Sequence, residues 1–334
     1  MKNIVIADEF KGVDFKPSEL LKEYLDLISR EVGEFFKPNI LKAVPCPACG
    51  VGKSAKAFAK FGLAYQECLA CATLYVSPRP SDADIIRFYK TSQARKFWNE
   101  RLYGITAVRR QEKIIKPRFQ WIEDSIQEYL PAAQKYADFN ANQRGYVAGI
   151  GLLPGFSSRT LVNPLAPLAP KDVPAGVTLD ERPWQEVKGT WDVISLFEVL
   201  DHTSDVEALF RTLHSSLPKG GLVFLTSILG SGFDIQTLWG NAEGLYPPDR
   251  LNLVSVEGLN TLSKRHGFEV LEFSTPGILD VEIVAKTLEA DPTLELPRFV
   301  RYLLNRPEHE RRAFQEFLQA NLLSSYARIL IRKT

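Results

Sequence analysis

Four cysteines constrain this chain more than any other feature of its sequence. They form two Cys-x-x-Cys pairs, Cys46 with Cys49 in CPACG and Cys68 with Cys71 in CLAC, and the 334-residue chain has no other cysteine. Two such pairs at this separation have the spacing of a zinc ribbon, in which each pair turns both thiolates toward one ion. We therefore predict a structural Zn²⁺ site, with unmetallated buried thiols or a redox pair as the alternatives.

The bulk composition narrows the setting in which such a site would work. Hydrophobic residues make up 45% of the chain, charged residues 24%, and the formal net charge is +1. This balance gives no general electrostatic reason to bind nucleic acid or a membrane surface. The opening MKNIVIADEF holds only a short apolar run, so we expect neither a secretory signal nor a membrane-spanning helix. A cytoplasmic protein is expected, where cysteine pairs bind metal more often than they form disulfides.

The first third of the chain divides into three predicted parts. Residues 1–40 contain one amphipathic helix, for which Ser18 is the predicted N-cap. Residues 41–80 form the zinc ribbon. A helical linker over 81–130 comes next, and it opens with a capping box of Ser81 and Asp84.

Basic residues are concentrated in one stretch of this linker, between Arg87 and Arg118. Such a stretch is most often a solvated helical face. The alternative is an anion site for a phosphate-bearing substrate or RNA.

From residue 131 to 334, short apolar runs alternate with helical patterns, which predicts repeated βαβ units. Several runs are apolar throughout, as expected of strands covered on both faces. We therefore predict an α/β fold with a doubly wound, Rossmann-like sheet. Helical sequence over about 277–322 interrupts the pattern before the last strand and is predicted to form an insertion near the substrate entrance.

Residues 191–227, WDVISLFEVLDHTSDVEALFRTLHSSLPKGGLVFLTS, resemble the fourth strand, following helix and fifth strand of class I S-adenosylmethionine-dependent methyltransferases. In this comparison a strand ends at Phe197, and Glu198 to His202 begin a helix. Together with CPACG, CLACATLYVSPRPS and YPPDRLNLVS, the chain resembles a bacterial group of zinc-ribbon methyltransferase-like proteins associated with sugar or surface-polysaccharide biosynthesis. The resemblance implies a small-molecule substrate, such as a nucleotide-linked sugar or surface-glycan precursor.

The same resemblance implies a site for S-adenosylmethionine. The stretch that corresponds to the glycine-rich cofactor loop is YADFNANQRG, where asparagine stands in place of glycine at two positions. Asparagine can adopt the left-handed conformation that such a turn needs, but its side chain occupies space, so we expect a narrower pocket and weaker cofactor binding. Asparagine also replaces the acidic residue that binds the ribose after the second strand. The predicted cofactor-binding residues are Asp138, Asn140, Asn142, Gly145, Asn163 and Glu198.

Ligands of an open α/β sheet bind beyond the carboxyl ends of its strands, where we look for catalytic residues. His202 is the main candidate for a base, because imidazole titrates near neutral pH; the alternative is a packing role. Glu198, Asp201 and His202 have a helical spacing that could bind a divalent ion. Acidic residues are common at helix starts for other reasons, so we do not predict a metal site there. Arg250 and Tyr326 replace histidines of the family and are predicted to bind a phosphate or a sugar hydroxyl. The predicted catalytic set is thus His202, Glu198, Arg250 and Tyr326.

These patterns are compatible with three functions. The first is an S-adenosylmethionine-dependent methyltransferase acting on a small molecule. The second is a non-catalytic homologue that serves as a binding or regulatory partner of another protein, which the asparagines of the cofactor loop favour. The third, an RNA methyltransferase, rests on the basic stretch and is disfavoured by the net charge. Whether side chains fill the crevice beside Asn140 and Asn142 distinguishes the first two.

Overall fold

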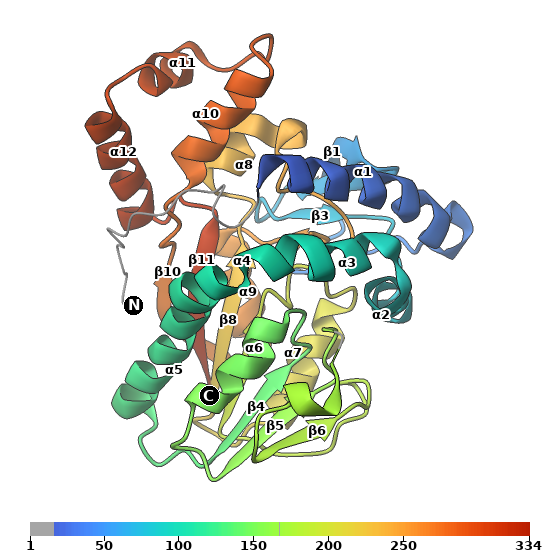
Figure 1. Cartoon of the computed structure of the whole chain (residues 1–334), viewed down its shortest axis with the longest axis vertical. Helices are drawn as coiled ribbons and strands as arrows, with labels where there is room; N and C mark the ends of the chain where they lie inside the picture. The colour runs from blue at the N-terminus through green and yellow to red at the C-terminus, as the bar shows by residue number, and fades with distance from the viewer. Residues whose placement is uncertain (1–16, 167) are drawn as a thin grey trace.

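The computed structural model describes residues 17–166 and 168–334 (Figure 1). Its centre is a seven-stranded sheet in the order β10-β11-β8-β7-β4-β5-β6. Strands β4 to β8 pair in parallel, whereas β11 is antiparallel to both of its neighbours. The strands are β4 (Lys135–Phe139), β5 (Ser158–Val162), β6 (Val177–Asp180), β7 (Val193–Phe197), β8 (Leu222–Ile228), β10 (Phe268–Ser274) and β11 (Tyr326–Lys333). The predicted α/β fold is confirmed.

Helices cover both faces of this sheet, as the apolar strands predicted. All five residues of β7 are buried, because each face of the strand meets a helical layer. Helices α7 (Val206–Ser215) and α9 (Val256–Arg265) contribute to the hydrophobic cluster on one face. Helices α5 (Lys116–Tyr129) and α6 (Arg144–Gly149) contribute to the cluster on the other.

The ribbon is a small antiparallel sheet in the order β1-β2-β3-β9. Strands β1 (Ser54–Lys60), β2 (Leu63–Cys68) and β3 (Leu74–Val76) come from the predicted ribbon segment. The fourth strand, β9 (Asn252–Leu253), comes from the α/β part of the chain and pairs with β3. The ribbon sheet is therefore completed by a segment that lies about 180 residues further along the chain.

The N-terminal elements agree with the predicted helices but not with one predicted cap. Helix α1 (Ser18–Phe35) begins at Ser18, and Pro17 is its N-cap without any side-chain capping bond. The prediction that Ser18 caps the helix is wrong, because Ser18 is already the first helical residue. Helix α2 (Asp82–Thr91) has the predicted capping box of Ser81 and Asp84. The opening MKNIVIADEF, for which no signal segment was predicted, lies outside the described residues.

The basic stretch winds through α3 (Gln93–Phe97), α4 (Tyr103–Arg110) and α5, with π-helical segments at Trp98–Leu102 and Gln111–Ile115. Arg95, Arg110 and Arg118 are buried, at 4%, 6% and 4% exposure. A solvated face therefore describes only part of this stretch. Two of its buried arginines, Arg110 and Arg118, act on a carboxylate at the carboxyl edge of the large sheet.

The predicted helical insertion is present between β10 and β11. It consists of α10 (Asp280–Ala290), α11 (Arg298–Leu304) and α12 (Glu308–Ala320), at the upper left in Figure 1. Helix α8 (Phe233–Leu238) packs beside α10. Short 3₁₀ helices complete the described chain at Pro38–Ile40, Ile150–Leu152, Pro170–Asp172 and Trp239–Asn241. Among the described helices, none has both the length and the apolar character that crossing a bilayer requires.

Candidate functional site

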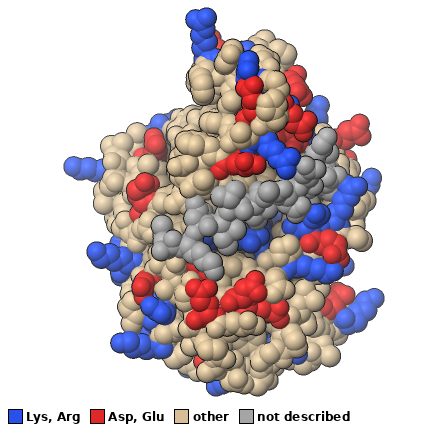
Figure 2. Space-filling view, turned by 90° about the vertical axis from the view of Figure 1, so that its left-hand side faces the viewer, with Lys and Arg blue, Asp and Glu red and all other residues tan. Residues whose placement is uncertain are grey.

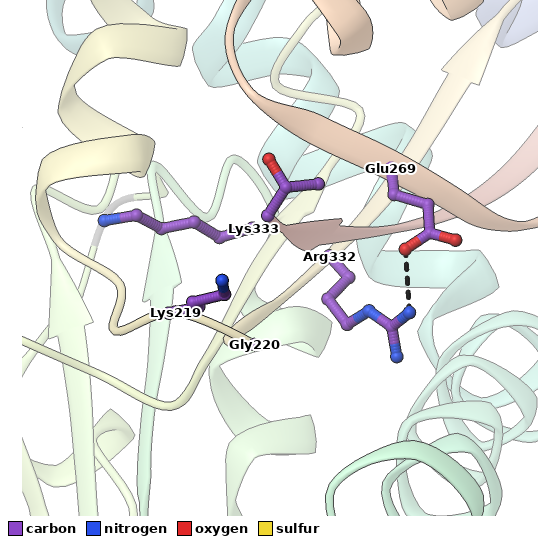
Figure 3. Close-up of a pocket in the computed structure, with 6 residues that line it drawn as sticks. Lys219, Gly220, Glu269, Arg332 and Lys333 are labelled. Carbon is purple, nitrogen blue, oxygen red and sulfur yellow. Dashed lines mark hydrogen bonds and ion pairs between the residues drawn. The ribbon is translucent and has the colours of Figure 1, made fainter.

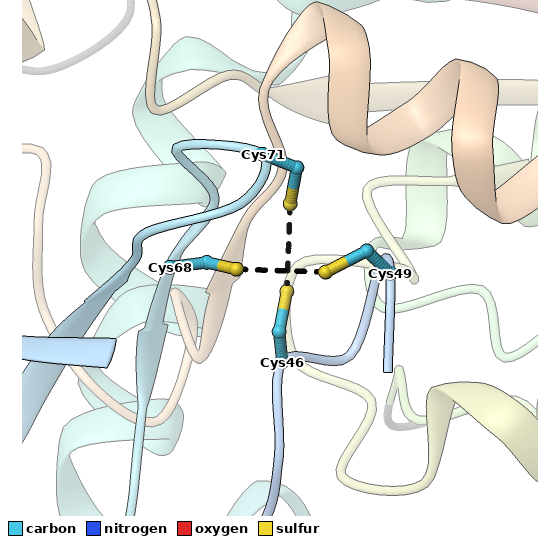
Figure 4. A group of neighbouring side chains, drawn as sticks. All are labelled: Cys46, Cys49, Cys68 and Cys71. Carbon is cyan, nitrogen blue, oxygen red and sulfur yellow. Dashed lines mark hydrogen bonds between the residues drawn. The ribbon is translucent and has the colours of Figure 1, made fainter. Parts of the chain in front are cut away.

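The four cysteines converge on one point between the two knuckles of the ribbon (Figure 4). Their sulfur atoms all lie within 4.8 Å of one another, with 3.6 Å between Cys46 and Cys71 and 3.5 Å between Cys49 and Cys68. Tetrahedral zinc with Zn–S bonds of about 2.3 Å would hold sulfurs about 3.8 Å apart. The sulfur positions thus fit a closed four-thiolate site.

The backbone of each knuckle folds so that both of its thiols face this point. The carbonyl of Cys46 accepts a hydrogen bond from Gly50 N, and the carbonyl of Cys68 accepts one from Ala72 N, both at 2.9 Å. Gly50 and Ala72 have φ values of 78° and 54°. Each turn therefore ends in a left-handed residue, which reverses the chain directly behind a cysteine pair.

Asp138, the predicted acidic cofactor residue, lies within β4 rather than beyond its end. Its carboxylate is 1% exposed and accepts a hydrogen bond from Ser195 on the neighbouring strand β7. Burial raises the pKa of Asp138 to about 7, although the Ser195 hydroxyl works in the opposite direction. The carboxyl group is thus held inside the sheet.

Asn140 and Asn163 connect the loops that come after β4 and β5. Both adopt left-handed backbone conformations, with φ of 56° and 44°, as anticipated for asparagine in a glycine-like turn. Asn163 Nδ2 donates to Asn140 Oδ1 at 3.0 Å, and the two residues are 4% and 3% exposed. The backbone nitrogens of Leu165 and Ala166 both donate to the carbonyl of Ala141 at 2.9 Å. The resemblance places the cofactor's methionine part at the loop after β4 and its ribose at the residue after β5, and here the two loops are hydrogen-bonded to each other.

Asn142 and Gly145 come next in the same segment. Asn142 is 6% exposed, so its side chain also lies inside the protein. At Gly145, in the first turn of α6, an added Cβ would lie 2.3 Å from Tyr103 Oη and 3.1 Å from Ile115 Cγ1. Glycine therefore allows α4 and the segment after it to pack on this turn. Asn140, Asn142 and Asn163 are thus all buried, and cofactor binding by these residues stays a prediction.

Glu198 lies directly after β7 and is surrounded by cationic side chains. Its carboxylate is 3.1 Å from Arg118 Nη1 and 3.9 Å from Arg250 Nη2, and it accepts a hydrogen bond from Tyr146 Oη at 2.9 Å. Burial alone would raise the pKa of Glu198, but the guanidinium groups of Arg118, Arg250 and Arg110 hold it below its usual value. Glu198 is therefore an anion at neutral pH.

Arg118 connects Glu198 to Tyr326, and it was not singled out from the sequence. Its Nε donates to Tyr326 Oη at 2.9 Å, and its Nη1 also donates to Tyr146 Oη. The guanidinium lies over the rings of Tyr146, Phe197 and Tyr326, with its carbon 5.1 to 5.8 Å from their centroids. The only sequence signal for this residue was its membership of the basic stretch.

The segment from Glu198 to His202 is not a helix, which corrects the prediction. Glu198 has a φ of 62°, and α7 begins only at Val206, where Asp205 caps it by accepting from Ala208 N at 2.8 Å. The helical spacing on which a divalent-ion site depended is therefore absent. Among the described residues, the cysteines are the group found with side chains placed to share a metal ion.

Asp201 and His202 are both buried behind Glu198. Asp201 lies 3.0 Å from Arg250 Nη1, and burial raises its pKa to about 7 against the opposing effect of Arg250. His202 is 2% exposed, its ring lies 5.1 Å from that of Tyr89, and burial lowers its pKa to about 4. Neither imidazole nitrogen has a hydrogen-bond partner among the described residues. A proton-transfer role for His202 stays a prediction.

Asp249 is a further buried acid next to the site, and no sequence pattern singled it out. It accepts hydrogen bonds from Tyr24 Oη at 3.1 Å and from Tyr89 Oη, and it pairs with Arg95 Nη1 at 3.1 Å. These partners belong to α1, α2 and α3. The N-terminal helices are thereby connected to the residue that precedes Arg250.

Two cavities of the described surface lie away from this edge. One, of about 380 Å³, lies where β8 and β10 begin and the antiparallel β11 ends, and it is lined by Lys219, Gly220, Glu269 and Arg332 (Figure 3). Arg332 is paired with Glu269 there at 2.7 Å. The other, of about 570 Å³, lies between the cysteine knuckle and the start of α7.

The fold and the site together define an α/β methyltransferase scaffold that carries a four-cysteine ribbon. Residues 49–273 match the family model described as a methyltransferase domain, so the chain belongs to that family. No curated protein matches the chain.

Solved structures give distant likenesses. One is the O-methyltransferase of a trans-AT polyketide synthase multienzyme from Brevibacillus brevis in complex with S-adenosyl-L-homocysteine, with 17% identity over 73% of this chain and 80% of that one and a TM-score of 0.42. Another is an S-adenosylmethionine-dependent methyltransferase from Clostridium acetobutylicum, with 10% identity, 69% and 98% coverage and a TM-score of 0.40.

Proposed function

We propose that the protein is a methyltransferase-family member that binds a small anionic molecule at the carboxyl edge of its sheet and has lost methyl transfer from S-adenosylmethionine. The observation that carries this proposal is the closure between the loops after β4 and β5. The bond from Asn163 to Asn140 and the two bonds to the Ala141 carbonyl join the loop expected at the cofactor's methionine part to the one expected at its ribose. A nucleoside would have to break these bonds and displace buried amide groups before it could enter.

The charge at the carboxyl edge supports an anionic ligand. Arg110, Arg118 and Arg250 all act on the single carboxylate of Glu198, and the second acid in contact with Arg250, Asp201, has a pKa near neutrality. Planar guanidinium groups suit phosphate and carboxylate ligands. Arg250 and Tyr326 remain the predicted contacts for a phosphate or a sugar hydroxyl. The ligand class we favour is therefore a surface-glycan precursor or a nucleotide-linked sugar whose nucleoside stays outside the joined loops.

Calorimetry tests the loss of the cofactor. Wild-type protein is titrated with S-adenosylmethionine and S-adenosylhomocysteine up to millimolar concentration, and we expect no binding heat. The triple variant Asn140→Gly, Asn142→Gly, Asn163→Asp restores the residues that the family pattern expects, and we expect it to bind S-adenosylhomocysteine. Micromolar binding to the wild type would overturn the proposal.

The second candidate is an active S-adenosylmethionine-dependent methyltransferase for the same small molecule. Family membership over residues 49–273 and the full seven-stranded scaffold favour it. This function would require the loops after β4 and β5 to separate when the cofactor binds. Binding of S-adenosylmethionine to the wild type, together with transfer of a labelled methyl group to a sugar nucleotide, would select it.

An RNA methyltransferase is the least supported function. Arg95, Arg110 and Arg118 of the basic stretch are buried, and basic side chains are interspersed with acidic ones across the face in Figure 2. A small anion can approach a recessed guanidinium group, but an extended phosphate backbone needs cations on the surface, and its binding weakens steeply with salt. Salt-dependent RNA binding that is lost on replacing Arg109 and Lys113 by alanine would be required.

We also propose that Cys46, Cys49, Cys68 and Cys71 bind one structural Zn²⁺. The paired spacing and the sulfur positions support this assignment. Four thiolates leave no open coordination position, so the ion would stabilise the ribbon without acting on a substrate. A cytoplasmic location stays an expectation from the sequence, and a protein partner is the expectation that accompanies the non-catalytic function.

A further inference from the structure

The segment 246–255, YPPDRLNLVS, lies between the ribbon and the carboxyl edge of the large sheet. On the ribbon side, Tyr65 Oη of β2 donates to the backbone carbonyl of Arg250 at 2.6 Å, and Val76 N donates to the carbonyl of Leu251 at 2.9 Å. Ser255 Oγ donates to the carbonyl of Cys71, one of the four cysteines. The ribbon thus contacts the backbone of this segment from Arg250 to its end.

On the other side, the same segment is attached to the turn after β7. The backbone nitrogens of Leu251 and Asn252 donate to the carbonyl of Asp201 at 2.7 and 2.9 Å. The Asn252 side chain donates to the carbonyls of Leu200 and Thr203, both at 2.8 Å. The side chain of Arg250 extends past this turn to the carboxylates of Asp201 and Glu198.

We propose that the metal-bound ribbon positions Arg250 at the carboxyl edge, and that Tyr65 is the positioning residue that transmits this effect. Ligand binding at the edge then depends on the metal at the four cysteines, although the metal does not touch the ligand. This inference rests on the proposed anion-binding function. A carboxylate titration tests the positioning of Arg250, and a separate binding assay tests the anion function, so the failure of one can be told from the failure of the other.

The Arg250 backbone nitrogen donates to the Tyr246 carbonyl at 3.1 Å and its Nη1 to the Asp249 carbonyl at 3.0 Å, and the ribbon adds contacts that these bonds within the segment do not supply. Strand β9 has two residues and β3 has three, so neither pairing is stable without the rest of the ribbon sheet. Tyr65 is fully buried, and its ring stacks on Phe58 of β1 with centroids 4.8 Å apart. The strand that carries Tyr65 ends at Cys68, and the carbonyl of Cys71 accepts the hydrogen bond from Ser255. The contacts of the ribbon with Arg250 and with Ser255 therefore both lie close to a proposed metal ligand.

The proposed coupling is measured through Asp201, whose charged neighbours are Arg250 and Glu198. Carbon-13 NMR of labelled aspartate carboxyls monitors its titration, and Asp201→Asn assigns the signal. Tyr65→Phe removes the hydrogen bond to the Arg250 carbonyl and lets the Arg250 side chain move away from Asp201. Because the guanidinium group favours the ionised carboxylate, we expect the titration midpoint of Asp201 to rise by about half a pH unit. A chelator applied to the wild type is expected to raise it at least as far.

Tyr75→Phe is the matched control. Tyr75 is a buried tyrosine of β3 in the same sheet, and among the described residues its hydroxyl makes no hydrogen bond to segment 246–255. We expect its Asp201 midpoint to equal that of the wild type. An equal midpoint in wild type, Tyr65→Phe and Tyr75→Phe would overturn the positioning role. This comparison uses metal-bound proteins, so it holds even if the metal-free chain unfolds.

Binding of inorganic pyrophosphate provides the second measurement. By calorimetry we expect Tyr65→Phe to bind it about three- to tenfold more weakly than wild type, and Tyr75→Phe to bind it equally well. If wild type does not bind pyrophosphate but the Asp201 midpoint still moves in Tyr65→Phe, the proposed anion function fails while the positioning stands. Equal pyrophosphate affinity in the two variants would count against the positioning of Arg250.

Discussion

Replacing Arg118 by methionine tests whether this arginine organises the carboxyl edge. The change removes the ion pair to Glu198 at 3.1 Å, the hydrogen bond to Tyr326 at 2.9 Å and the contacts with three aromatic rings. Breaking a buried ion pair by removing one partner costs about 3–5 kcal/mol. The Glu198 side chain is 19% exposed and keeps Arg250 at 3.9 Å, so we expect a loss of about 2–4 kcal/mol in the free energy of unfolding.

Urea unfolding at pH 7 measures this loss, with Arg101→Met as the control. Arg101 belongs to the same basic stretch but is exposed, so its replacement is expected to change stability by less than about 0.5 kcal/mol. A double-mutant cycle with Glu198→Gln isolates the pair, for which we expect a coupling of at least about 1 kcal/mol. Equal losses in Arg118→Met and Arg101→Met, or additive effects in the cycle, would refute the reasoning.

Three other variants test single contacts. Asp138 has a folded-state pKa of about 7, above its unfolded value, so the folded protein binds the extra proton and wild type loses stability as pH rises from 4 to 7. Asparagine cannot titrate, so the free energy of unfolding of Asp138→Asn, measured with urea, should rise by about 2.5 kcal/mol relative to that of wild type between pH 5 and 8. A difference between the two proteins that does not change with pH would contradict this. Gly145→Ala places a Cβ 2.3 Å from Tyr103 Oη, and it should cost about 1–3 kcal/mol in the same assay, whereas Gly155→Ala, with nothing within 4 Å, should cost far less. Cys49→Ser should lower the zinc content, measured by elemental analysis, from one ion per chain to near zero. The control Ser54→Ala should keep its zinc. Equal zinc content in both variants would exclude the cysteine site.

The resemblance to class I methyltransferases predicted the scaffold correctly. Its prediction for the turn after β7, the strand that corresponds to the family's fourth, was wrong. The resemblance implies that Glu198 to His202 begin a helix directly after the strand. In the folded protein Glu198 takes a left-handed conformation between Arg118 and Arg250, and the helix starts at Val206. The two arginines are distant in sequence, so local pattern gives no information about them.

The basic stretch shows a second limit of periodicity. Helical faces are predicted from 3.6 residues per turn, but the π-helical segments at Trp98–Leu102 and Gln111–Ile115 add residues to the turn and rotate the next part of the helix. Arg110 and Arg118 lie beyond the first and the second of these segments respectively and are buried, as is Arg95 ahead of both.

The sequence by itself determined the elements that depend on near neighbours. Cysteine spacing predicted the ribbon, because two ligands three residues apart can face one ion, and continuous apolar runs predicted the buried strands. It also indicated that asparagine replaces glycine in the cofactor loop. Only the tertiary structure decided that Asn140 bonds Asn163, that β9 completes the ribbon, and that Tyr65 bonds the Arg250 carbonyl. Each of these joins residues from separate segments, and their meeting depends on packing of the whole chain.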